Sequence, residues 1–170
     1  MIDTQTSYAL PLAFHVVDGD LQKKMAAHLA AAIKTPMAGY PAYSLLTGFI
    51  GTAWISKALS DNGMSEEAYR LLQYEGYPSW LYPVKNGATT IWERLNSYTV
   101  KDGFGENNSM NSFNHYSFGA VASWMYNYSL GICRDEKSPG FKHFILKPEV
   151  DPTRGITHAE GYYDSMYGRI

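Results

Sequence analysis

The chain has 170 residues, a formal net charge of −2 and an unusually high aromatic content, with 14 Tyr, 7 Phe and 4 Trp. Its 14 basic residues form no stripe that would neutralise a phosphate backbone, which argues against a nucleic acid partner. No apolar run approaches the roughly 20 residues of a membrane helix, and we expect no membrane span and no secretion signal, with the cytoplasm as the default compartment. A single cysteine, Cys133, excludes an intrachain disulfide and a cysteine-cluster metal site, and we interpret it as a small buried apolar residue.

Apolar side chains recur at helical spacing through the first half of the chain. This periodicity predicts four helices, over residues 4–17, 21–34, 47–59 and 66–74. The prolines and glycine of residues 35–43 predict a loop between the second and third helices. Ser65 is predicted to cap the fourth helix, and Gly76 to follow its end.

The segment 77–111 lacks long periodic stretches and is predicted to be mostly loop, with one brief helix over residues 88–95. Long ordered loops in compact domains are usually functional. Residues 111–130 are predicted to form the strongest helix of the second half, with Trp124 on its buried face and Gly131 as its stop.

After Pro139-Gly140 the pattern changes to an alternation of period two over residues 141–146, and residues 156–163 also look extended. Two strands are therefore predicted after the helices. Helical pairs followed by strands predict a mainly α fold, an α/α barrel or toroid with a β-sandwich that begins near Phe141.

The candidate site lies in the predicted loop and just beyond it, where Glu93 stands between Trp92 and Arg94, and His115 follows among amides and aromatics. Sugar C–H faces stack on aromatic rings while a carboxylate acts on the acetal carbon, so this composition favours sugar chemistry. Local sequence alone leaves open that Glu93 only pairs with Arg94 and that His115 is structural. Trp80 is a candidate for stacking on a pyranose ring, with a core position as its alternative.

Four segments, in chain order, closely resemble the C-terminal half of the catalytic domain of bacterial α-L-rhamnosidases, glycoside hydrolase family 78. They read TQTSYALPLAF, LLTGFIGTAW, YPSWLYPVKNGATTIWERLNSY and MNSFNHYSFGAVASWMYNYSLGI. The closing GFKHFILKP and YYDSMYGRI look like the opening of the β-sandwich that follows that domain. GATTIWER and NSFNHYSFG are the most specific of these motifs.

The resemblance implies that residues 1–138 belong to an (α/α)6 catalytic barrel and residues 139–170 to the start of a C-terminal β-sandwich. It implies inverting hydrolysis of terminal α-L-rhamnosides in a glycoside or oligosaccharide, with no cofactor and no metal ligand in this chain. Glu93 matches the family's general base, and His115 matches a sugar-binding histidine. The alternatives are an (α/α)6 glycosidase for another sugar and a non-catalytic module that binds sugar or a partner chain.

Two departures from the family pattern bear on activity. The general acid of the family comes from a motif that this chain lacks, so we expect a fragment with little activity by itself. The family's second tryptophan and aspartate after WER are Leu95 and Asn96 here, which puts any role of that pair in doubt. An incomplete barrel would also leave apolar helix faces uncovered, and we expect self-association through them.

Overall fold

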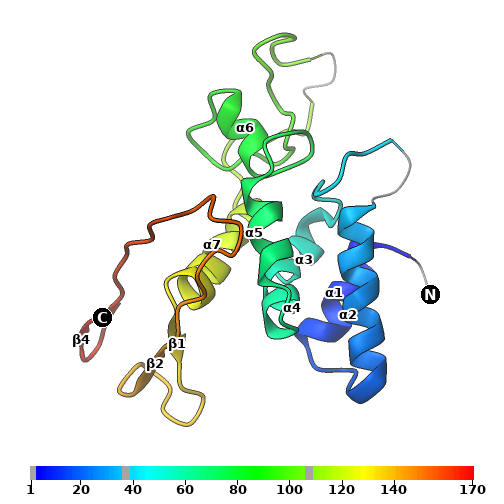
Figure 1. Cartoon of the computed structure of the whole chain (residues 1–170). Helices are drawn as coiled ribbons and strands as arrows, with labels where there is room; N and C mark the ends of the chain where they lie inside the picture. Colours follow the sequence, from blue (N-terminus) through cyan, green and yellow to red (C-terminus); the bar gives the residue numbers. More distant parts are fainter. Residues whose placement is uncertain (1–2, 36–38, 106–108) are drawn as a thin grey trace. The chain divides into compact units, whose positions relative to one another are not determined.

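The computed structural model describes residues 3–35, 39–105 and 109–170, and most of its helices and strands are labelled in Figure 1. The chain forms two compact units, Met1–Ala120 and Val121–Ile170. In the described residues the first unit is built from helices, and strands occur only in the second. This agrees with the predicted mainly α chain that ends in a few strands. The domain boundary expected after residue 138 stays a prediction.

The regular elements of the first unit, in its described residues, are helices and one isolated bridge between Thr99 and Gly103. The helices are α1 (Gln5–Ala13), α2 (Gly19–Lys34), α3 (Gly48–Thr52), α4 (Ile55–Asp61), α5 (Ser65–Gln73), α6 (Leu81–Lys85) and the 3-10 helix η1 (Ser117–Ala120). α1 packs against α2, α3 and α4, and α4 packs against α5. Their inward faces form the core, which includes Leu12, Leu29, Ile33, Ile55, Leu59, Tyr69 and Leu71.

Helix α1 begins where the sequence predicts but ends four residues earlier. Thr4 caps it, because the Thr4 hydroxyl accepts the Ser7 N–H and the Ser7 hydroxyl accepts the Thr4 N–H. At the other end His15 has a φ of 53°, and the Val16 N–H reaches back to the Pro11 carbonyl. This is a Schellman stop with histidine where glycine is usual, which is why the sequence does not signal it.

The predicted helix over residues 47–59 is two helices, α3 and α4, separated at Ala53 and Trp54. α3 lies so close to α1 that a Cβ on Gly51 would collide with the Thr6 hydroxyl oxygen. The close packing of α3 on α1 therefore fixes the direction of α3, and α4 begins as a separate helix at Ile55. The fourth predicted helix is confirmed as α5, but Ser65 is its first residue and the N-cap position is Met64.

Of the two predicted helical segments near the site, the first is wrong and the second is confirmed in part. Residues 88–95 form no helix, whereas α6 lies just before them, with Pro83 in its first turn, where a proline is tolerated. The predicted helix over residues 111–130 becomes regular only at Ser117, as η1. The described part of the predicted loop 35–43 contains no helix, and residues 36–38 lie outside the description.

The second unit starts with α7 (Val121–Trp124) and a π-helical turn, η2 (Met125–Ser129). Gly131 follows with a φ of 72°, which confirms the predicted stop, and Trp124 is buried as predicted. β1 (Ile132–Arg134) and β2 (Phe144–Leu146) pair antiparallel, with Cys133 opposite Ile145. β3 (Asp164–Ser165) and β4 (Gly168–Arg169) form a second antiparallel pair. β2 confirms part of the predicted strand 141–146, whereas residues 156–163 form no strand and β1 was not predicted.

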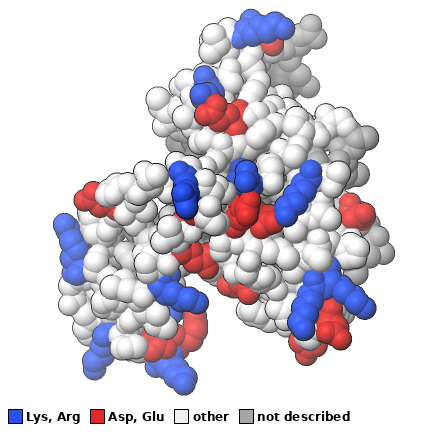
Figure 2. Space-filling model, viewed as in Figure 1, with Lys and Arg blue, Asp and Glu red and all other residues white. Residues whose placement is uncertain are grey.

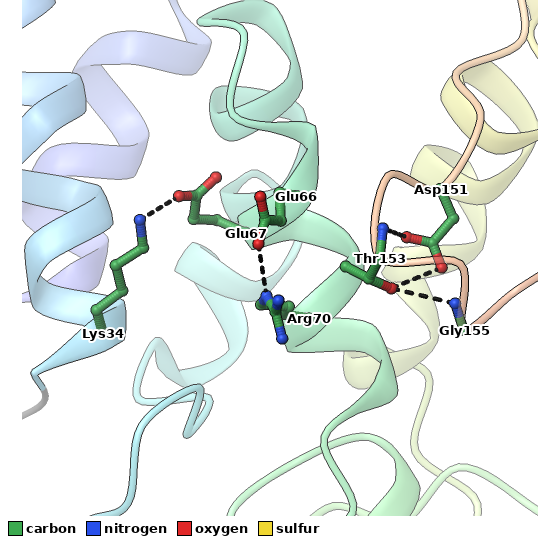
Figure 3. A network of polar contacts seen from close by, with 7 residues as sticks. All are labelled: Lys34, Glu66, Glu67, Arg70, Asp151, Thr153 and Gly155. Atoms are coloured by element: carbon green, nitrogen blue, oxygen red, sulfur yellow. Dashed lines mark hydrogen bonds and ion pairs between the residues drawn. The ribbon is translucent and has the colours of Figure 1, made fainter.

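Basic and acidic side chains are interspersed on the face drawn in Figure 2, between broad uncharged areas. Figure 3 shows the Lys34–Glu67 and Glu66–Arg70 ion pairs of the first unit and the hydrogen bonds among Asp151, Thr153 and Gly155 in the second. In the second unit the buried Asp151 carboxylate accepts the N–H groups of Thr153 and Ile156, each at 2.8 Å, and so stabilises the turn formed by residues 151–156.

Within the described ranges, every helix is too short or too polar to cross a bilayer. These ranges also hold no group of three side chains suited to a metal ion.

Lys34 joins α2 to α5 through an ion pair with Glu67, with the ammonium nitrogen 2.5 Å from the carboxylate (Figure 3). The hydrogen bond to Glu67 raises the pKa of Lys34. The pair therefore contributes stability below the ordinary lysine pKa of about 10.4, and this contribution is lost as the pH rises through the higher folded value.

We expect Lys34→Met to lower the free energy of unfolding by about 1 kcal/mol at neutral pH. The Glu67 side chain is only 12% exposed and would lose its partner, but the half-exposed lysine keeps the effect below that of a fully buried pair. Urea unfolding measures it, with Lys23→Met as the control, because Lys23 and Asp20 are 80% and 90% exposed and 3.8 Å apart. Equal effects of the two substitutions would contradict a role of this pair in joining the helices.

Cys133 is half-buried on β1, and its thiol donates to the Asn127 carbonyl. It is thus less buried than the sequence predicts. Burial raises the pKa of the Cys133 thiol. Because the thiolate is the reactive form, we expect alkylation by iodoacetamide at about pH 8 to be slower in the folded protein than in guanidinium chloride, and to accelerate as the pH rises. Equal rates in the two states would contradict this prediction.

Candidate active site

The two motifs singled out in the sequence lie side by side in the first unit. The Glu93 N–H donates to the Ser112 carbonyl at 2.8 Å, and the His115 N–H donates to the Ile91 carbonyl at 2.7 Å. The Thr90 hydroxyl donates to the Phe113 carbonyl in the same pairing. Residues 90–93 and 112–115 are therefore held together by hydrogen bonds. This pairing brings the backbones of Glu93 and His115 close together.

One oxygen of the Glu93 carboxylate is anchored by the facing segment. The Ser112 N–H donates to Glu93 Oε2 at 2.7 Å, so Glu93 and Ser112 are joined by two reciprocal hydrogen bonds. Glu93 is half-buried, whereas Trp92 and Leu95 on either side are buried and hold the segment to the core. Oε1 accepts no hydrogen bond from the described residues. A carboxylate fixed through one oxygen, with the other oxygen available, is suited to receive a proton from a bound water.

The His115 imidazole is half-buried and is fixed from two sides. Its Nδ1 accepts the N–H of Ser117 at 3.3 Å. Its ring stacks on Phe49, with centroids 4.7 Å apart, and on its neighbour Tyr116, with centroids 5.4 Å apart. The first part of the predicted helix 111–130, up to residue 116, is absent because backbone groups of this segment bond to residues 90–93 instead.

Trp80 is buried next to this pairing. It is only 8% exposed, and its indole N–H donates to the Phe118 carbonyl at 2.9 Å. With Ile91, Trp92 and other residues it lines a cavity of about 40 Å³. Small-molecule sites measure roughly 300–1,000 Å³, so this cavity is a packing void. The burial of Trp80 favours a role in holding the η1 segment, and stacking of Trp80 on a sugar stays a prediction.

Aromatic rings surround the paired segments. Trp92 meets Phe113 edge to face, with centroids 5.5 Å apart, and Phe104 meets Phe113 in the same manner at the same distance. The Arg94 guanidinium donates to the Met110 carbonyl at 3.3 Å. Asp102 is exposed, and its carboxylate and N–H both bond to the Thr99 hydroxyl within one turn.

Sequence reasoning missed three residues that build this site. Ser112 holds Glu93 through its backbone groups, and its hydroxyl accepts the Asn114 N–H at 3.1 Å within its own segment. Ser117 also acts through its N–H. Phe49 is distant in the sequence and looks like one apolar residue among others on a helix. The sequence around each residue does not predict these contacts, because they depend on how the folded backbone brings the residues together.

The chain matches two families described from known proteins. Residues 1–129 match the bacterial alpha-L-rhamnosidase 6 hairpin glycosidase domain, and residues 131–170 match the bacterial alpha-L-rhamnosidase C-terminal domain. An alpha-L-rhamnosidase of Streptomyces avermitilis is 37% identical over 168 residues, which is 99% of this chain and 15% of that protein. One from Alteromonas sp. (strain LOR) is 38% identical over 168 residues, again 99% of this chain and 17% of that protein.

The solved structures that match this chain are also those of α-L-rhamnosidases. The crystal structure of the S. avermitilis alpha-L-rhamnosidase complexed with L-rhamnose matches 98% of this chain with a TM-score of 0.82 and 34% identity. That of the native Aspergillus terreus enzyme matches 87% with a TM-score of 0.76 and 34% identity. The chain spans 15% and 16% of those two chains. The chain belongs to the bacterial α-L-rhamnosidase family, with residues from its six-hairpin glycosidase domain and from its C-terminal domain.

Proposed function

We propose that this chain supplies the general base of an inverting α-L-rhamnosidase, with Glu93 as the base and His115 as a hydrogen-bonding partner of the sugar. The observation that carries the proposal is the reciprocal pair of Glu93 and Ser112, which anchors one carboxylate oxygen at 2.7 Å. Relatives named alpha-L-rhamnosidase, one of them solved with L-rhamnose, support rhamnose as the sugar.

The chemistry requires two carboxyl groups. In inverting hydrolysis one carboxylic acid protonates the leaving oxygen, and a carboxylate about 6.5–9.5 Å away deprotonates a water on the opposite face of the sugar. Glu93 supplies the second of these groups. The water loses its proton to Glu93 as its oxygen bonds to the anomeric carbon, and the glycosidic bond breaks with the proton of the acid on the leaving group.

The same arrangement supports a pyranoside as the substrate class. The His115 imidazole offers a directional hydrogen bond, and the rings around it offer apolar faces that match the C–H faces of a pyranose. A terminal α-L-rhamnoside of a glycoside or oligosaccharide fits these features.

A panel of aryl glycosides tests this function in the full-length protein. We expect hydrolysis of the α-L-rhamnoside and none of the matched glycosides of other sugars. Preferential hydrolysis of another sugar would overturn the substrate assignment. Binding of L-rhamnose without hydrolysis of the rhamnoside would overturn the catalytic assignment and identify a sugar-binding module.

A further inference from the structure

The ring of Phe49, on α3, stacks on the His115 imidazole, although the two residues belong to separate segments of the chain. The two rings are close to parallel, with centroids 4.7 Å apart and an interplanar angle of 19°. Phe49 is itself held by Phe118, which meets it edge to face with centroids 5.3 Å apart. The contact thus connects α3 with the segment that leads into η1.

The hydrogen bonds of His115 determine which of its nitrogens is a donor. Nδ1 accepts the Ser117 N–H, so in this arrangement Nδ1 presents its lone pair and the ring proton is on Nε2. The backbone of His115 is fixed by its bond to Ile91. Among the described residues, Nε2 makes no hydrogen bond, and it is therefore available as a donor to a ligand oxygen.

The bond from the Ser117 N–H to Nδ1 is long, at 3.3 Å, and restrains only loosely the rotation of the imidazole about χ2, which is broad for histidine. A flat ring stacked on the imidazole restricts this rotation, whereas an aliphatic side chain of similar volume only fills space. The direction of the Nε2–H bond therefore depends on the rings stacked on the imidazole, of which Tyr116 is the sequence neighbour of His115 and Phe49 comes from a separate helix.

We propose that Phe49 is a positioning residue, which holds the Nε2–H of His115 in the direction needed to donate to a hydroxyl of L-rhamnose. This inference rests on the proposed function, since it assigns His115 to the sugar. It adds a residue from a separate helix that does not itself have to touch the substrate.

A double-mutant cycle on the full-length protein tests the inference, with the Kd for L-rhamnose measured by ligand-observed NMR. We expect Phe49→Leu to raise Kd by about 3- to 10-fold, the range expected for loss of an aromatic stacking contact. Phe49→Tyr keeps the ring and is expected to bind as the wild type does. In a His115→Ala background Phe49→Leu is expected to have no further effect, because the imidazole that it positions is gone.

Phe14→Leu is the matched control. Phe14 is another exposed phenylalanine of the first unit, and its ring contacts that of Trp54 with centroids 4.6 Å apart. A Kd unchanged by Phe49→Leu, or an equal increase with and without His115, would overturn the positioning role while leaving the proposed function in place. A wild-type protein that does not bind L-rhamnose would overturn the proposed function and this inference with it.

Discussion

Replacing Glu93 with glutamine is expected to lower kcat for an aryl α-L-rhamnoside by about 10²- to 10⁴-fold, the usual effect of removing a general base. Glutamine keeps an oxygen that can accept the Ser112 N–H, so the reciprocal pairing of the two segments survives. It cannot take a proton from water at neutral pH. The substitution therefore separates the chemical role of the carboxylate from its structural role.

The measurement is the steady-state rate of the full-length protein, with circular dichroism and the melting temperature as checks on folding. Glu66→Gln is the matched control, because Glu66 lies on α5, is exposed and pairs with Arg70 (Figure 3). We expect Glu66→Gln to keep the wild-type rate. A folded Glu93→Gln protein with substantial residual turnover would remove Glu93 from the role of base.

Gly131→Ala is expected to be the most destabilising single substitution in the second unit. Gly131 has a φ of 72°, and a Cβ there would collide with the Pro148 nitrogen and the Lys147 carbonyl carbon. Both are backbone atoms and cannot rotate away. The close approach is fixed further by the Lys147 N–H, which donates to the Gly131 carbonyl at 2.8 Å.

We expect a loss of about 3 kcal/mol or more in the free energy of unfolding of this unit, from the left-handed backbone together with the clash. Gly140→Ala separates the two causes, since Gly140 has a φ of 91° but no atom within 4 Å of the position that a Cβ would occupy. That control is expected to lose only about 1–2 kcal/mol. Urea unfolding followed by tryptophan fluorescence compares them, because Trp124 belongs to this unit. Equal losses would contradict the close approach of the chain at Gly131.

The sequence predicts the helices that bury a regular apolar face. α2 and α5 follow from their spacing, and residues such as Leu29 and Ile33 are buried as that spacing requires. The end of α1 is not predicted, because His15 adopts the conformation that usually requires glycine. β1 is not predicted either, since three residues have no periodicity of their own and become a strand by pairing with β2.

For the candidate site, the sequence suggests Glu93 and His115 but neither their arrangement nor the residues that hold them. Glu93 and His115 stand out through the motifs around them, and the pairing of residues 90–93 with 112–115 explains why both motifs belong together. The same pairing uses backbone groups that the predicted helix would have needed. The local sequence does not predict a role for Phe49, because its contact with His115 depends on the packing of α3.

The anomer of L-rhamnose that is released first tests the central claim most directly. ¹H NMR of the full-length protein with an aryl α-L-rhamnoside resolves it before mutarotation mixes the forms. If Glu93 activates water on the face opposite the leaving group, the β-anomer appears first. First release of the α-anomer, or no release of rhamnose, would contradict the assignment of Glu93 as the base of an inverting hydrolase.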